Sequence, residues 1–378
     1  MKQCKNTFPL GQSGFSLIEL IVYLAILTVL MSAVVISFHG TTYRVFQQSG
    51  IAETKIETDV GLELLRSDLE HAGFGLPWQS TTNMNYTEPV PLAGASTDIP
   101  RALISEDLSA NSHNGADYLV IRATNVIRGV SGQKWGYVGR KIDHTIDVQS
   151  MSSDVFENTD RVIVLRPETS NGVYRQLVMD GATYATQPTL AEMATFAPDA
   201  TPNDPDGERY LVYGVNDASI KRPFNRTDYF ISAANVPTLC APNTGVLVKV
   251  TANQANDNLS LPMPIVDCVA DFQIIYYRDT NGDGGWDLRS DANGLAGLSA
   301  EQIRNQVKAI RCYLLTHEGG KDDHFTYANN AINVGEVDTD GTTLLAGRSF
   351  TLDTIIGGNW ANYRWKVVSL AVTPKNLK

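Results

Sequence analysis

The sequence predicts an α+β fold in which a long N-terminal helix packs on an antiparallel β-sheet domain. Three observations support this fold class. An uninterrupted apolar run extends from Phe15 to Phe38, apolar residues at helical spacing continue to Leu76 without a proline, and strand-like runs dominate the rest of the chain. A helix and a sheet must each bury one apolar face, so the second half of the helix is expected to lie on the sheet. A chain of 378 residues is long enough for that arrangement.

The apolar run contains one charge, the carboxylate of Glu19. As a helix the run is about 36 Å long, which is enough to span a bilayer. A charge within hydrocarbon costs roughly 2.5–3.5 kcal/mol on insertion scales, so it usually marks a functional partner. Lys2 and Lys5 precede the run and orient the start of the chain toward the cytoplasm. A secretory signal peptide has a shorter apolar core, and a plain membrane anchor gives no reason for Glu19.

Beyond Phe38 the helical pattern becomes amphipathic. Charged residues, Asp68 among them, occupy the positions between the apolar ones. The segment from Gly73 to Pro77 combines two glycines with a proline and is expected to end the helix. The predicted apolar stripe consists of Ile56, Val60, Leu62, Leu64, Leu65 and Leu69.

Strand-like runs follow the helix and predict a β-rich domain. Two segments rich in proline and polar residues, Thr81 to Pro100 and Thr186 to Pro205, are expected to form surface loops. The predicted strands are Asp117–Arg122, Trp135–Val138, Arg161–Leu165, Val173–Val178, Arg209–Val212, Gly245–Thr251, Cys268–Tyr277, Val307–Leu315 and Tyr363–Val372.

Charge and cysteine usage limit the partners and the compartment. The formal net charge of -11 argues against nucleic acid as the main partner, since phosphate binding needs a basic patch. Cys240, Cys268 and Cys312 lie in the part of the chain expected to face an oxidising compartment. One disulfide and one buried thiol is the simplest allocation. The sequence leaves the pairing open, and Cys240 with Cys268 is our candidate pair.

A candidate calcium loop runs from Asp279 to Asp287. Calcium prefers oxygen ligands, and Asp279, Asn281, Asp283, the carbonyl of Gly285 and Asp287 supply oxygens at alternate positions, as the D-x-N-x-D-G template requires. A strand rather than a helix is predicted before the loop, and Ser290 takes the place of the usual glutamate, so an EF-hand fold is not expected. The alternative is a hairpin turn rich in Asn, Asp and Gly with no ion. Magnesium fits less well.

Other polar clusters carry no recognisable chemistry. His317, Glu318, Asp322, Asp323 and His324 share one loop, but their spacing matches no zinc site, and a solvated turn is expected. The sequence contains no G-x-S-x-G, Gly-rich phosphate loop or H-E-x-x-H. We therefore expect no enzymatic activity.

The segment Gly14-Phe15-Ser16-Leu17-Ile18-Glu19 resembles the class III signal sequence, G-F-x-x-x-E, of the type IV prepilin family. The resemblance implies that a prepilin peptidase cleaves between Gly14 and Phe15 and methylates the new amino terminus. It also implies a leader at residues 1–14, a helix at residues 15–76 with its membrane part at 15–38, and a β-rich extracytoplasmic domain at 77–378. Together these give the lollipop shape of type IV pilins.

Later segments are similar to the PilW-type minor pilins, one branch of that family. The stretch from Leu64 to Gly75 is similar to the helix-ending "LRxDLRxAGYG" of this group, and the regions Tyr276–Asp287, Val307–Leu315 and Tyr363–Asn376 resemble it more loosely. Major pilins commonly carry a helix-kinking proline at the position that Ile36 occupies here. This departure favours a minor subunit.

The family resemblance implies that the protein functions in assembly. Glu19 would pair with the amine of Phe15 in a neighbouring subunit, and the protein would prime pilus assembly or form part of the tip complex. Its expected partners are other pilin subunits, the prepilin peptidase and the inner-membrane assembly platform, with the globular domain in the periplasm before assembly and on the cell surface after it. Two alternatives stay open, a minor pseudopilin of a type II secretion system and a membrane-anchored adhesin that uses calcium.

Overall fold

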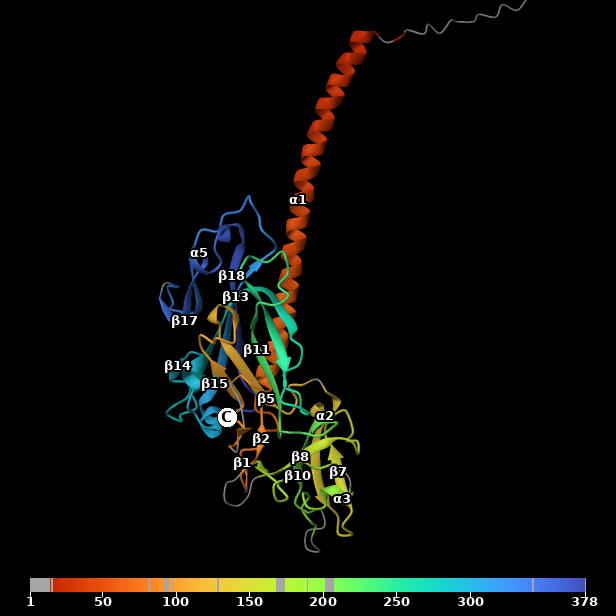
Figure 1. Cartoon of the computed structure of the whole chain (residues 1–378), viewed down its shortest axis with the longest axis vertical. Helices are drawn as coiled ribbons and strands as arrows, with labels where there is room; N and C mark the ends of the chain where they lie inside the picture. Colours follow the sequence, from red (N-terminus) through yellow and green to blue (C-terminus); the bar gives the residue numbers. More distant parts are fainter. Residues whose placement is uncertain are drawn as a thin grey trace, which may run out of the picture.

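The computed structural model describes residues 14, 16–80, 82–91, 95–96, 98–127, 129–167, 174–188, 190–200, 207–341 and 343–377. Its dominant element is helix α1, Leu17–Glu70, which projects from the β-rich domain as a gently curved rod (Figure 1). Its 54 residues correspond to a length of about 81 Å. The long N-terminal helix and the mostly antiparallel sheet domain confirm the predicted α+β fold class.

Helix α1 ends earlier than the sequence analysis predicted. The helical residues stop at Glu70 rather than Leu76, and residues 71–75 form turns. Gly73 and Gly75 adopt φ angles of 83° and 69°, in the left-handed region that glycine enters without strain. The amide of Gly73 donates to the carbonyl of Arg122 at 2.9 Å, so the chain leaves the helix to join the sheet.

An eight-stranded sheet forms the centre of the domain. Along its main path the strand order is β18-β15-β13-β12-β11-β5-β4, β14 pairs with β13, and all neighbouring strands are antiparallel. The strands are β4 Leu103–Glu106, β5 Tyr118–Ala123, β11 Asn225–Ser232, β12 Gly245–Thr251, β13 Met263–Arg278, β14 Leu288–Ser290, β15 Val307–Glu318 and β18 Arg364–Val372.

The two faces of this sheet are covered by different elements. Leu65 and Leu69 of α1 belong to one buried cluster together with Ile274 of β13. Ile275, the next residue of β13, belongs to a second cluster with Phe350, which comes from a β-hairpin on the other face. The alternation follows from the two-residue period of a strand. The hairpin consists of β16 Ala331–Val337 and β17 Leu344–Thr351.

A six-stranded sheet occupies the end of the molecule away from the free end of α1 (Figure 1). Its order is β1-β9-β8-β10-β6-β7, with β1 parallel to β9 and the other pairs antiparallel. Val162, Val164 and Val212 pack with Met193 and Phe196 in a core of its own. The strands are β1 Gln79–Ser80, β6 Trp135–Arg140, β7 Ile146–Ser150, β8 Arg161–Arg166, β9 Gln176–Leu177 and β10 Tyr210–Asn216.

Short elements complete the chain, and three of them lie in segments predicted as loops. Residues 81–100 contain a small pair of strands, and residues 186–205 contain helix α3; parts of both segments lie outside the described residues. The short elements are β2 Tyr86–Thr87, β3 Ala95–Ser96, α2 Val130–Gln133, α3 Leu190–Met193, α4 Ala300–Gln306 and α5 Leu352–Ile355.

All nine predicted strands have a counterpart, but the predicted set was incomplete. Strand β12 coincides with its prediction, whereas β9 covers only part of the predicted run and residue 173 lies outside the described residues. Strands β4, β7, β11, β16 and β17 were not predicted, and neither were the shortest strands. Strand β11 was missed because its sequence is polar, although Asn225, Arg226, Thr227 and Asp228 are all buried.

Candidate functional site

The first half of α1 presents apolar side chains on every side. Leu17, Val29, Ile36 and Phe38 are each at least 70 % exposed, because no part of the domain covers this stretch. By length and composition the helix can cross a membrane. An apolar surface of this size is stable only in lipid or against other proteins.

Glu19 lies in the first turn of α1, and its side chain is exposed. Gly14 is exposed as well, whereas Phe15, the residue predicted to carry the methylated amine, lies outside the described residues. Ser16 is the N-cap of the helix and makes no capping hydrogen bond with its side chain. The carboxylate therefore stands near the start of an exposed apolar helix, where it is open to a partner from another molecule.

The second half of α1 contacts the sheet through a narrower stripe than predicted. Leu62, Leu65 and Leu69 are buried as expected. Ile56 and Val60, which were assigned to the same stripe, are 65 % and 67 % exposed. Residues 56 and 60 lie on a different side of the helix from residues 62, 65 and 69, since successive residues are 100° apart.

Asp68, one of the charged residues between the apolar positions of the helix, is buried against the sheet, which the sequence pattern did not indicate. Its carboxylate forms an ion pair with Nζ of Lys249 on β12 and accepts a hydrogen bond from the hydroxyl of Tyr229 on β11 at 2.7 Å. Lys249 Nζ also donates to the carbonyl of Val126 at 3.2 Å. The helix is thus attached to two strands by charge-assisted hydrogen bonds.

Residues 318–325 form a second attachment, on the part of α1 nearer the apolar half. The hydroxyl of Tyr43 donates to Asp322 at 3.0 Å, and the amide of Gly319 donates to the hydroxyl of Thr54 at 3.2 Å. Asp322 also accepts from Arg364 of β18 at 2.6 Å. The prediction of a solvated turn was therefore wrong for Asp322, which supports the helix where it leaves the domain.

His317 is a buried structural residue rather than part of a solvated turn. Its Nε2 accepts from the amide of Ala241 at 2.9 Å, and its Nδ1 lies 3.0 Å from the carbonyl of Gly319. Burial lowers the pKa of His317 to about 4, so the ring is neutral at physiological pH. The Sγ atoms of Cys240 and Cys268 and a ring nitrogen of His317 lie within 4.8 Å of one another.

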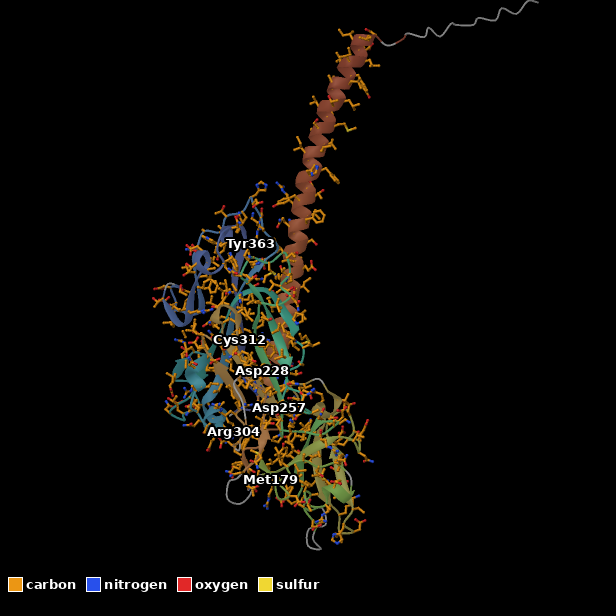
Figure 2. The ribbon with its side chains drawn as sticks, viewed as in Figure 1. Met179, Asp228, Asp257, Arg304, Cys312 and Tyr363 are labelled. Atoms are coloured by element: carbon orange, nitrogen blue, oxygen red, sulfur yellow. A yellow bond between two sulfur atoms is a disulfide. The ribbon has the colours of Figure 1, made fainter. Side chains whose placement is uncertain are left out.

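The three cysteines of the domain have two different roles. Cys240 and Cys268 form a disulfide that closes a segment with a sequence separation of 28. Both sulfurs are bonded to each other, and both nitrogens of His317 have backbone partners, so this group is a structural junction rather than a metal site. Cys312 is a free buried thiol on β15, and burial raises its pKa (Figure 2).

The loop predicted to bind calcium is held together by its own amides. Asp279 accepts from the amides of Gly282 at 2.6 Å and Gly284 at 2.9 Å, and Asp287 accepts from the amide and the hydroxyl of Thr280. The hydrogen bond from the Thr280 side chain is the largest cause of a lowered pKa at Asp287. The carboxylate oxygens of this loop do not converge within 4.8 Å of one another in the part of the chain that the structure describes.

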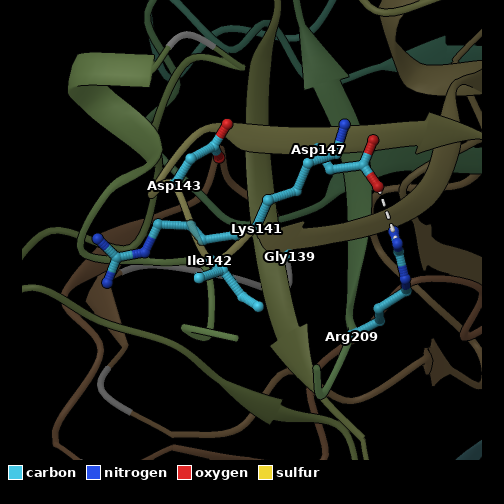
Figure 3. Close-up of a pocket in the computed structure, with 7 residues that line it drawn as sticks. Gly139, Lys141, Ile142, Asp143, Asp147 and Arg209 are labelled. Atoms are coloured by element: carbon cyan, nitrogen blue, oxygen red, sulfur yellow. Dashed lines mark hydrogen bonds and ion pairs between the residues drawn. The ribbon is translucent and has the colours of Figure 1, made fainter. Parts of the chain in front are cut away.

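A cavity of about 490 Å³ lies beside β6 and β7 (Figure 3). Asp147 is 2.8 Å from Nη2 of Arg209, and Arg140 pairs with Asp199. Asp147, Arg209 and Arg140 are thus each paired, and we assign no reaction to this cavity. The lining residues are Gly139, Arg140, Lys141, Ile142, Asp143, Asp147 and Arg209.

A buried charge network, which sequence reasoning missed, lies within the main sheet. Arg226 donates to both carboxylate oxygens of Asp228 at 2.7 Å, and Tyr118 donates to the same carboxylate at 2.7 Å. Arg122 pairs with Glu88 at 2.6 Å, and both side chains are buried. These groups are satisfied by one another, so they support the fold rather than a reaction.

Comparison with known protein families matches the start of the chain. Residues 10–35 match the prokaryotic N-terminal methylation motif. No curated protein and no solved structure matches the chain. The matched region contains the predicted cleavage position after Gly14 and the carboxylate of Glu19, and it supports membership of a type IV pilin or pseudopilin family.

Proposed function

We propose that the protein is a minor pilin of a type IV pilus that takes part in priming assembly or forms part of the tip complex. The observation that carries this proposal is the single carboxylate of Glu19 at the start of a helix whose side chains are exposed and apolar to Phe38. The methylation motif covers the same stretch. An ionised acid in lipid is costly, and a cationic partner offsets that cost.

The proposed partner is the amino terminus of a second subunit. Cleavage after Gly14 would give Phe15 a positively charged amine at the start of the apolar helix. Neither this amine nor Glu19 is stable alone in hydrocarbon, so pairing between subunits is strongly favoured there. Repeated head-to-tail contact of this kind does not close on itself and generates a helical filament.

The size of the extramembrane domain favours a minor position. The six-stranded sheet is added to the main sheet at the end away from the free end of α1, and it enlarges the domain beyond what contacts the helix (Figure 1). A subunit that repeats along a fibre must contact copies of itself on all sides, and large additions obstruct this. Helix α1 also continues without a break through Ile36, where major pilins carry a proline.

The proposed location follows from the helix and the disulfide. Before assembly the apolar half of α1 anchors the protein in the inner membrane, and the domain faces the periplasm. A disulfide such as Cys240–Cys268 persists in that oxidising compartment. The proposed partners are the prepilin peptidase, the other major and minor pilins and the inner-membrane assembly platform.

We also propose that the Asp279–Asp287 loop binds calcium. Gly284, at the sixth position of the template, donates its amide to Asp279 at the first, and this hydrogen bond curls the loop around its carboxylates. An ion would draw Asp279, Asp283 and Asp287 together with the side chain of Asn281 and the carbonyl of Gly285.

Recovery of the protein in sheared filaments tests the assembly role. Glu19→Ala should lower that recovery strongly while the domain stays folded. Glu63→Ala is the matched control, because Glu63 lies on the same helix with a side chain 72 % exposed, and it should behave as the unchanged protein. Normal recovery of Glu19→Ala would refute the pairing.

Two further measurements distinguish the alternatives. Mass spectrometry of the mature protein should find N-methylphenylalanine at position 15. Deletion of the gene should reduce the number of surface filaments and leave protein secretion unchanged. Loss of secretion with normal filaments would instead identify a pseudopilin.

A further inference from the structure

Trp286 stands out among the tryptophans because its ring is open to solvent. Its side chain is 52 % exposed, whereas the other four tryptophans are buried or half-buried. It lies near the end of the Asp279–Asp287 loop, just before β14. A large exposed aromatic side chain on an ordered loop is typical of a binding surface rather than of a core.

The ring of Trp286 is held in a fixed orientation. The ring of Tyr277 meets it edge-on at a centroid distance of 4.9 Å, and the guanidinium of Arg289 lies 5.6 Å from its centroid. The guanidinium of Arg311 lies 5.1 Å from the centroid of Tyr277. Two arginines and two aromatic rings thus form one contiguous group, the Trp286 cluster.

The Trp286 cluster has more positive charge and more donors than it has acceptors. Arg289 and Arg311 share one carboxylate, that of Glu336, each at 3.3 Å. Tyr277 is 4 % exposed, yet its hydroxyl has no hydrogen-bond partner within the described residues, and the same is true of the buried Nε of Arg289. Two guanidiniums that face one carboxylate leave a net positive charge and favour a ligand that supplies an anionic oxygen.

The carboxylates of the acidic loop beside the cluster are engaged in contacts of their own. The carboxylates of Asp279 and Asp287 accept hydrogen bonds from the loop itself, and Asp283 accepts from the amide of Gly285 at 2.8 Å. Asp279 additionally lies 3.5 Å from Nζ of Lys308. The loop carboxylates are therefore directed into the loop.

The cluster lies on the face of the domain that α1 leaves free. Tyr277 belongs to the buried cluster beneath the β16–β17 hairpin, and the helix packs against the opposite face. Figure 1 places β14 and β17 on the side of the domain away from α1. Contacts made through α1 during assembly would leave this surface accessible.

We propose that the Trp286 cluster binds an acidic sugar unit of a polysaccharide. The apolar face of the sugar ring stacks on the indole, and the sugar carboxylate takes the charge that Glu336 leaves unpaired on Arg289 and Arg311. Stacking on the solvent-exposed indole suits a sugar unit within a polysaccharide chain, because the neighbouring sugar units can extend beyond the indole into solvent. The inference goes beyond the assembly role and does not depend on it.

The test uses the full-length protein in detergent and a matched pair of ligands. A galacturonic acid trimer should bind, with quenching of tryptophan fluorescence and a measurable heat in calorimetry. Its methyl ester, which has the same rings without the charge, should bind at least about tenfold more weakly, since hydrogen bonds to charged groups are lost. Glucuronic and sialic acid oligomers extend the panel to other acidic sugars.

Variants locate the site. Trp286→Ala and Arg311→Gln should each weaken calorimetric binding at least about tenfold, and Trp286→Phe should retain most of it. Arg66→Gln is the control, because Arg66 is another arginine paired with a glutamate but lies on α1. Three results would each overturn the proposal. They are equal affinity for the acid and the ester, equal weakening of binding by Arg66→Gln, and no binding of any acidic sugar of the panel at millimolar concentration. Such a result would leave a protein partner as the occupant of this surface.

Discussion

The carboxylate of Asp68 on α1 and the ammonium of Lys249 on β12 form an ion pair whose side chains are 10 % and 5 % exposed. The pair joins the helix that carries the assembly motif to the sheet that carries the rest of the domain. Tyr229 adds a third hydrogen-bonding group from β11. The orientation of α1 relative to the domain therefore depends on charges that are shielded from water, together with the apolar contacts of Leu65 and Leu69.

Removal of one member of this pair should be costly. Asp68→Ala leaves Lys249 buried without its counter-charge, and we expect a loss of roughly 3–5 kcal/mol in the free energy of unfolding. Denaturant unfolding of the full chain in detergent measures it. Glu63→Ala, at an exposed pair on the same helix, should cost less than about 1 kcal/mol. The double variant Asp68→Leu/Lys249→Met should recover most of the loss, and failure to recover would contradict a cost that arises from the unpaired charge.

The same residues mark the limit of what sequence patterns predict here. The apolar half of α1 follows from an unbroken apolar run, and the major apolar strands follow from their hydrophobic pattern, because those strands are buried. Strand β11 and the burial of Asp68 do not follow from the sequence pattern, because charged residues occupy the buried positions. Such residues look like surface residues until tertiary contacts supply their partners, Lys249 for Asp68 and Arg226 for Asp228.

Some residues of the candidate site can be recognised in the sequence and others cannot. Glu19 is recognisable in the sequence, since a single acid in a long apolar run is costly in lipid and stands out from its neighbours. The Trp286 cluster could not be predicted, because Arg311 and Glu336 come from strands far from Trp286 in the chain and their register is not visible in sequence. The support of α1 by Asp322 is equally a consequence of tertiary structure.

A carboxyl pair between α1 and β13 should make stability depend on pH. The pKa of Glu57 is raised from 4.5 to about 7, mainly by burial and further by the neighbouring carboxylate of Asp267. In the folded protein Glu57 therefore keeps its proton at pH values where the unfolded chain has lost it. The contribution of Glu57 to the free energy of unfolding should therefore fall as pH rises from about 4.5 to about 7, and it should change little above about 7.

Thermal unfolding across this range tests the prediction. Glu57→Gln mimics the protonated form and should flatten the pH dependence, with the larger gain in stability at the upper end of the range. Glu63→Gln, on the solvent side of α1, is the control and should leave the dependence unchanged. A profile that keeps its slope in Glu57→Gln would show that another group is responsible.

Calcium should stabilise the folded protein if the Asp279–Asp287 loop binds it. An ion bound only by the folded state adds about 2.7 kcal/mol at a concentration one hundred times its dissociation constant, so the melting temperature should rise with calcium and fall again with chelator. Asp287→Asn should abolish the rise. Asp340→Asn is the control: it removes an exposed acid from another turn, and the rise in melting temperature with calcium should remain. An unchanged melting temperature in the natural protein would leave the loop as a turn held by amides.

Gly61 provides a test of how closely α1 approaches the sheet. A Cβ at this position would overlap the carbonyl oxygen of Ile265 on β13, so helix and strand touch through their backbones here. Replacement of a helical glycine by alanine normally stabilises by about 0.5–1 kcal/mol. Gly61→Ala should instead destabilise, because the strand must move away from the helix and disturb the neighbouring contacts of Leu65. Gly50→Ala is the control, since the nearest atom to its Cβ is the Cα of Gly319 at an ordinary 3.8 Å, and it should be neutral or stabilising. If Gly61→Ala gains stability as Gly50→Ala does, α1 lies farther from the sheet than described. The contact between Asp68 and Lys249 would then also be looser than described.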